Sequence, residues 1–93
     1  MFTMSRKAAL EIANEEGMIV IDGFDDAILG FSSQCGENTV LAYDIEKMVS
    51  IFSEREDVSY SESYEYIEYN CIGAYMGEDN PVYIRSVDEV VCE

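Results

Sequence analysis

The chain has 93 residues, a length that fits one small domain with a single core. Apolar residues make up 48% of it, too many for a disordered acidic tail. Twenty carboxylates face five basic side chains, so the formal net charge is −15. This charge argues against direct binding to nucleic acid or to an anionic membrane, and the lack of histidine excludes catalysis by imidazole.

The net charge is high for so short a chain. A folded protein of this mass exposes roughly 5,400 Å², which is about 360 Å² for each net charge. Duplex DNA carries one phosphate on about 110 Å² of its surface when it is treated as a cylinder. Only clustering on one face could therefore produce a DNA-like surface. The charge serves either solubility or the recognition of a basic partner.

Three cysteines, Cys35, Cys71 and Cys92, fit neither a CxxC motif nor, without histidine, a zinc site. An odd number of unpaired thiols is typical of a reducing compartment. No signal-peptide core follows the first residues, and the longest uninterrupted aliphatic run, 18–21, is too short to span a membrane. We expect a cytoplasmic protein without a membrane partner, a metal or a cofactor, and Cys71 in the core.

The first predicted element is a helix that begins at a Ser5 or Thr3 cap and runs to about Glu16. Gly17 is suited to the position just beyond its end. The apolar side of this helix is thin, because it consists mainly of small residues. Its members are Ala9, Leu10, Ile12 and Ala13.

Three strands are predicted next, over 18–21, 27–32 and 39–43. Short turns rich in Asp, Gly and Asn separate them, and such connections are too short for a parallel crossover. We therefore expect an antiparallel meander. In the middle strand, alternation places Ile28 and Gly30 on one face and Leu29 and Phe31 on the other.

Two helices and a last strand are predicted in the second half. Asp44 caps a helix whose apolar residues recur at i, i+3, i+4 and i+7, and Ser59 with Glu62 forms a capping box for the next helix, which we expect to end at Gly77. An edge strand over 81–87 follows. The apolar faces of the two helices are Ile45, Met48, Val49 and Phe52, and Tyr60, Tyr64, Ile67, Cys71 and Ala74 or Tyr75.

These elements predict one α+β domain over residues 1–93, in the order α-β-β-β-α-α-β, with 87–93 as an acidic tail. An antiparallel sheet of three to four strands would pack against the helices.

Six carboxylates and one arginine fall between residues 54 and 68, and Tyr66 and Tyr69 flank the last of the glutamates. Steps of three residues keep glutamates on one side of a helix. The interpretation without a function is a helix face that is simply exposed to solvent. The functional one is a surface for Arg or Lys side chains, because a guanidinium can stack on Tyr and form a fork with a carboxylate. The residues are Glu54, Glu56, Asp57, Glu62, Glu65, Tyr66, Glu68 and Tyr69.

A second acidic cluster, Asp22, Asp25 and Asp26, falls in one predicted turn. Turn chemistry explains aspartate at such positions without function. The alternatives are a contact with the same basic partner or a site for a hard cation. No glycine-rich phosphate loop is present, and we assign no catalytic residue.

A pattern of short motifs extends over about two-thirds of the chain. It consists of the segment 23–30, Cys35-Gly36, Tyr43-Asp44, Asn70, 73–75, Gly77-Glu78 and Pro81-Val82. This pattern resembles a family of small uncharacterised phage and prophage proteins whose function is unassigned. The resemblance implies a viral setting, in which small acidic domains without motifs often inhibit a host enzyme.

The leading hypothesis is a non-enzymatic, phage-type inhibitor that binds a basic surface of a host protein, for example a surface that binds nucleic acid, as a negatively charged mimic. The alternative is a regulatory or structural module that self-associates, for example as a homodimer, and uses charge for solubility only. A third hypothesis is a small enzyme that uses Asp22, Asp25 or Asp26, with or without a divalent ion.

Overall fold

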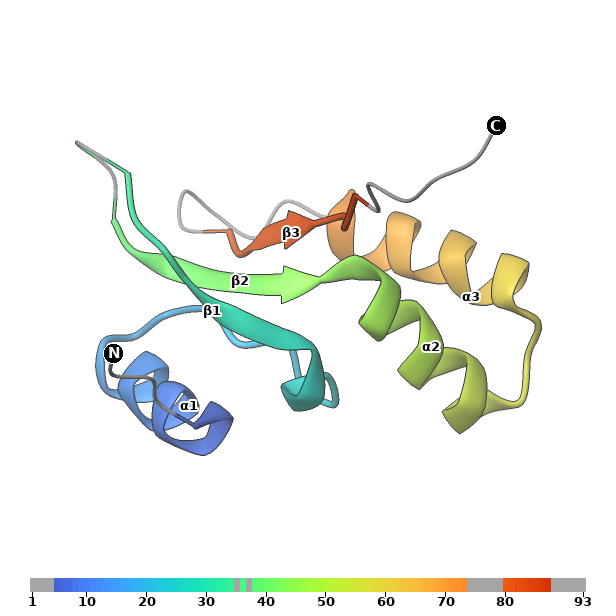
Figure 1. Cartoon of the computed structure of the whole chain (residues 1–93), viewed down its shortest axis with the longest axis horizontal. Helices are drawn as coiled ribbons and strands as arrows, with labels where there is room; N and C mark the ends of the chain where they lie inside the picture. The colour runs from blue at the N-terminus through green and yellow to red at the C-terminus, as the bar shows by residue number, and fades with distance from the viewer. Residues whose placement is uncertain (1–4, 35, 37, 74–79, 88–93) are drawn as a thin grey trace.

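The computed structural model describes residues 5–34, 36, 38–73 and 80–87. Three helices and a three-stranded sheet make an α+β protein, as predicted (Figure 1). The elements in chain order are α1 (Arg6–Glu15), the 3₁₀ turn η1 (Asp25–Ala27), β1 (Ile28–Ser32), β2 (Val40–Asp44), α2 (Ile45–Glu56), α3 (Tyr60–Ile67), the π-helical segment η2 (Glu68–Ile72) and β3 (Val82–Ile84).

The sheet is mixed, with the strand order β1-β2-β3. β1 and β2 are antiparallel, as predicted, but β3 runs parallel to β2, so the predicted antiparallel sheet is confirmed only in part. The reason is the path of the chain: α2 and α3 together form a crossover long enough to return it to the same end of the sheet. The predicted edge strand over 81–87 is confirmed as a shorter edge strand.

Residues 18–21, predicted as a strand, are not one. Their side chains are partly buried against the core, and the Ile21 N–H donates a hydrogen bond of 2.9 Å to the hydroxyl oxygen of Tyr43. The Tyr43 hydroxyl of β2 thus accepts the hydrogen bond that the carbonyl of a neighbouring strand would otherwise accept from the Ile21 N–H.

The predicted faces of β1 are also corrected. Ile28 pairs with Tyr43, but two residues further along Gly30 pairs with Ala42, so the strand bulges at Leu29. The bulge shifts the alternation by one residue. Ile28 and Phe31 therefore face the core together, and Leu29 is 53% exposed.

The helix ends agree with the sequence. Ser5 caps α1 by accepting a hydrogen bond from the Ala8 N–H, and Gly17, with a φ of 74°, lies just beyond its end. Asp44 caps α2. Ser59 and Glu62 form the predicted capping box of α3.

α2 and α3 pack closely because a small residue lies between them. Ser63 is fully buried, and its hydroxyl donates a 2.6 Å hydrogen bond to the carbonyl of Val49. Ile67 and Cys71 are buried below it, as predicted, whereas Tyr60 is 54% exposed. The predicted positions Ala74, Tyr75 and Gly77, like Cys35 and Cys92, lie outside the described residues.

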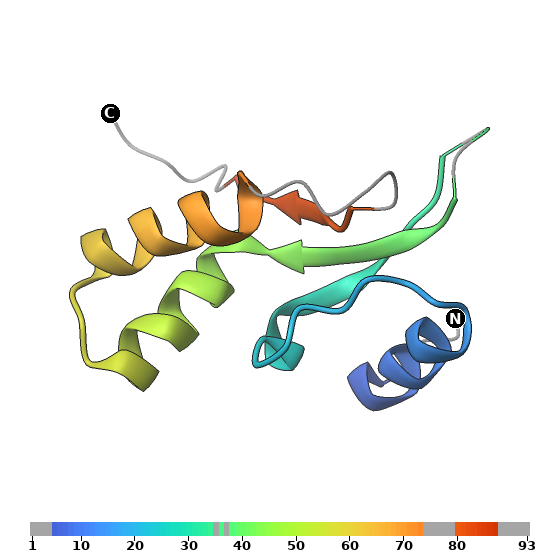
Figure 2. The ribbon, with the colours of Figure 1, turned by 180° about the vertical axis from the view of Figure 1, so that it is seen from behind.

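One apolar cluster joins all three helices and the sheet, and α1 and α3 lie toward opposite ends of the molecule (Figures 1 and 2). Within the part of the chain that the structure describes, no helix is long and apolar enough to cross a membrane. The buried members of the cluster are Ala13, Phe24, Ala27, Ile28, Leu41, Tyr43, Ile45, Met48, Val49, Ile67 and Cys71.

Candidate functional site

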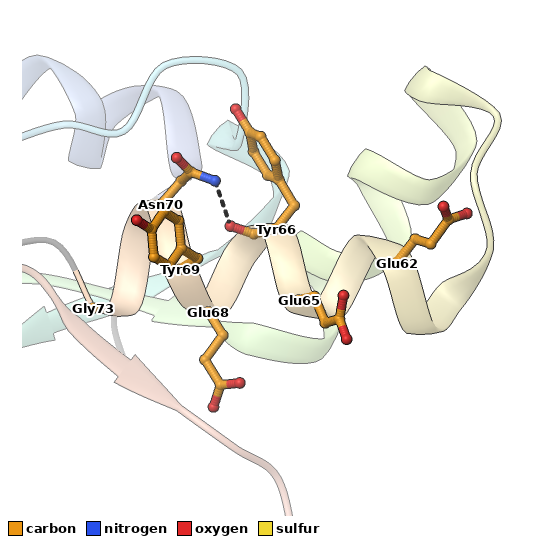
Figure 3. Close-up of a pocket in the computed structure, with 7 residues that line it drawn as sticks. All are labelled: Glu62, Glu65, Tyr66, Glu68, Tyr69, Asn70 and Gly73. Atoms are coloured by element: carbon orange, nitrogen blue, oxygen red, sulfur yellow. Dashed lines mark hydrogen bonds between the residues drawn. The ribbon is translucent and has the colours of Figure 1, made fainter.

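The outer side of α3 and η2 carries five of the eleven predicted partner-binding residues (Figure 3). They line a shallow open depression of about 760 Å³, to which no Lys or Arg contributes. We call it the α3 face. It is lined by Glu62, Glu65, Tyr66, Glu68, Tyr69, Asn70 and Gly73.

The three glutamates of the α3 face are not equivalent. Glu65 and Glu68 point to the same side of the helix, whereas Glu62 points away toward the turn that precedes α3 (Figure 3). The capping box explains the difference, because the Glu62 carboxylate accepts hydrogen bonds from the N–H and the hydroxyl of Ser59 at 3.4 and 3.3 Å. Glu62 therefore stabilises the helix, and Glu65 and Glu68 are the pair best placed for a partner.

The two tyrosines also differ. The ring of Tyr66 stacks on Phe52 with centroids 4.1 Å apart and planes within 10°, so one of its faces is already covered. Tyr69 is 82% exposed. Of the two, Tyr69 therefore offers a partner's guanidinium the larger exposed ring surface for stacking.

The π-helical turn shapes the end of the α3 face. The Gly73 N–H donates to the carbonyl of Glu68 at 2.8 Å, which widens the last turn by one residue. Asn70 donates its amide to the Tyr66 carbonyl at 3.0 Å and joins the lining. Sequence reasoning missed Asn70 and Gly73 as lining residues. A Cβ at Gly73 would lie 3.0 Å from the Glu68 carbonyl oxygen, which is a tight contact.

The predicted residues Glu54, Glu56 and Asp57 are exposed but do not line the α3 face. They lie at the end of α2, where Asp57 closes the helix in a left-handed conformation with a φ of 56°. Glu56 pairs with Arg55 at 3.6 Å, the one ion pair within the described ranges. Part of this charge is therefore compensated within the chain.

Asp22, Asp25 and Asp26 are exposed around η1, separate from the α3 face. Burial is the main cause that raises the pKa of Tyr43. The hydrogen bond from the Ile21 N–H lowers that pKa, and the charges of Asp25 and Asp22 raise it. Among the described residues, no three Asp, Glu or Cys side chains are arranged to hold a metal ion.

Arg55 connects the aspartate loop with the α3 face. Its guanidinium lies 5.0 Å from the ring centre of Phe24 and 5.6 Å from that of Phe52, which in turn stacks on Tyr66. The guanidinium also donates a hydrogen bond of 3.2 Å to the carbonyl of Gly23. A Cβ at Gly23 would lie only 2.7 Å from the same guanidinium nitrogen. The aspartates and the α3 face are thus fixed relative to each other by one row of stacked side chains.

The buried thiol of Cys71, the buried ring of Tyr43 and the partly buried ring of Tyr83 belong to the core. Burial raises the pKa of the Cys71 thiol, which favours an inert neutral thiol over a nucleophilic thiolate. Burial also raises the pKa of Tyr83 to about 12, and its ring centre lies 6.3 Å from that of Tyr43. These groups support the α3 face through the core.

The overall charge density does not approach that of DNA. The chain exposes 6692 Å² for a net charge of −15, or roughly 450 Å² per charge, about a quarter of the density of a duplex. Along α3 the density is higher, because glutamates three residues apart are separated by about 4.5 Å of helix axis. Phosphates of one DNA strand follow each other about every 3.4 Å along the axis. Any resemblance to DNA is therefore local.

Comparisons of the chain with protein-family models, with curated proteins and with solved structures find no match.

Proposed function

We propose that the protein is a small acidic binding protein of the phage type, which inhibits a host protein by occupying a basic surface that would otherwise bind nucleic acid. The observation that carries this proposal is the α3 face. It combines the paired carboxylates of Glu65 and Glu68 with the open ring of Tyr69 and has no cation in its lining.

Recognition follows from the chemistry of these groups. Glu65 and Glu68 take the place of two successive phosphates and accept charge-assisted hydrogen bonds from Arg or Lys. Tyr69 supplies a stacking surface, and Tyr66 is already held in place by Phe52 and loses little freedom on binding. Long-range attraction between the acidic chain and a basic partner accelerates the encounter.

The test is affinity capture from a bacterial lysate at roughly 50 and 500 mM salt, which span weak and strong screening of exposed charge. Support requires a nucleic-acid-binding protein that is captured at low salt, lost at high salt and displaced by DNA. The variant Glu65→Lys/Glu68→Lys should no longer capture this protein. The control is Glu11→Lys/Glu15→Lys, which reverses two exposed charges on α1. Glu62 stays unchanged because its substitution would also break the capping box.

Self-association is the competing function, and a specific surface favours it. β3 is an edge strand with Val82 37% and Ile84 41% exposed, and edge strands pair readily with other chains. This function predicts a dimer by light scattering that persists at 500 mM salt. Such a dimer, together with capture that the Glu65→Lys/Glu68→Lys variant leaves unchanged, would overturn the inhibitor proposal.

A further inference from the structure

A second groove is lined by α1 and the outer edge of β1. α1 lies toward the opposite end of the molecule from α3 (Figures 1 and 2). The groove measures about 240 Å³ and is lined by Ser5, Arg6 and Ala9 of the helix and its cap and by residues 28–31 of the strand. This volume is below that of typical small-molecule pockets. It suits a chain segment that passes through the groove.

The edge of β1 offers backbone groups for such a segment. β2 lies on one side of β1, and among the described residues no strand lies on the other. Both backbone groups of Ile28 are occupied, since its N–H donates to Asp25 and its carbonyl accepts from Arg6 Nε at 3.1 Å. Beyond Ile28, alternate residues of an edge strand direct N–H and C=O groups outward, which places the free edge at 29–32.

The charge at this groove is opposite to that of the rest of the chain. Arg6 and Lys7, two of the five basic residues, stand together in the first turn of α1. Arg6 uses its Nε on Ile28, and within the described ranges it forms no ion pair with a carboxylate. Its two terminal nitrogens thus remain to receive a carboxylate in the planar arrangement that a guanidinium favours.

We propose that this groove binds an extended acidic peptide, which adds as a strand to the β1 edge and places a carboxylate on Arg6. Exposed Leu29, at the bulge, would contact one of its apolar side chains. Peptides bind sheet edges in this way when backbone bonds give affinity and adjacent pockets give specificity. A peptide fits better than a phosphate polymer, because the outward N–H and C=O groups of the β1 edge match those of a peptide backbone.

The test is a ¹H–¹⁵N NMR titration of the full chain with the probe peptide acetyl-Thr-Val-Thr-Val-Glu, with a free C-terminal carboxylate, in 150 mM NaCl. We expect saturable shifts confined to Arg6 and 28–32, with a Kd on the order of 1 mM, as suits a short unoptimised peptide. The probe with Gln in place of Glu and an amidated C-terminus should bind about tenfold more weakly, because it lacks charge-assisted hydrogen bonds to Arg6.

Two variants and a control decide the result. Leu29→Glu places a negative charge at the edge and should abolish the shifts, while Val87→Glu adds the same charge at a 90% exposed position beyond β3 and should not. Arg6→Gln should remove the difference between the two probes. The absence of shifts at 28–32 in the folded wild-type chain, equal binding of both probes, or unchanged binding by Leu29→Glu would each overturn the proposal. None of these outcomes depends on the α3 face.

Discussion

Replacing Arg55 by Met tests how the aspartate loop is held against the helices. Arg55 makes two cation–π contacts, one hydrogen bond to Gly23 and one exposed ion pair. Cation–π contacts at exposed sites contribute about 0.5–1 kcal/mol each, the hydrogen bond about 1 and the ion pair close to nothing. Because these terms overlap and Met keeps the packing of the aliphatic stem, we expect a loss of about 2 kcal/mol in the free energy of unfolding.

The assay is urea unfolding followed by circular dichroism, with thermal melts in parallel. A loss of about 2 kcal/mol corresponds to a fall of roughly 8–16 °C in Tm for a domain of this size. Lys47→Met is the matched control, since it removes one exposed charge from the same helix, and it should cost about 0.5 kcal/mol or less. Equal losses for the two variants would refute the assigned role of Arg55 and leave only a general effect of net charge.

Further predictions concern the packing and the titration of the fold. Ser63→Ala removes the buried hydrogen bond to Val49 and should lower the free energy of unfolding by about 1 kcal/mol in the same assay. Ser59→Ala removes the cap of α3 and should also cost about 1 kcal/mol, with a matching loss of helical signal. The pKa values of Tyr83 and Cys71 are raised in the folded chain, so folding favours the neutral form of both side chains. The free energy of unfolding should therefore be highest at neutral pH, where both groups are neutral, and should fall as the pH rises from about 9 toward 12. A melting temperature that stays constant or rises over that range would contradict this.

Local signals predicted the helices well. Ser5, Asp44 and Ser59 each cap the helix for which the sequence proposed them, because a cap depends on residues within one turn of itself. The spacing of Ile67 and Cys71 correctly predicted the buried side of α3 and η2. The same periodicity predicted Glu62, Glu65 and Glu68 on one side of the helix. Glu65 and Glu68 share that side, whereas Glu62 points toward the turn before α3 and accepts hydrogen bonds from Ser59.

Longer-range features could not be predicted from these patterns. The parallel pairing of β3 depends on where two helices return the chain, and the bulge at Leu29 depends on its partner strand. Residues 18–21 have a strand-like composition, but the Tyr43 hydroxyl satisfies Ile21 in place of a neighbouring strand. The stack of Phe52 on Tyr66 joins side chains of two helices, so no sequence spacing indicates it.

The measurement that tests the central claim most directly is a ¹H–¹⁵N NMR titration of the chain with two peptides, one of alternating Gly and Arg and one of alternating Gly and Lys. If the α3 face binds basic side chains, we expect the shifts to be concentrated on residues 62–73, including Tyr69. The Arg peptide should bind more tightly than the Lys peptide, and Tyr69→Ala should remove this difference in affinity. Shifts spread evenly over the acidic surface, including Asp22, Asp25 and Asp26, with equal affinity for both peptides would contradict these expectations. The charge would then act without a specific face.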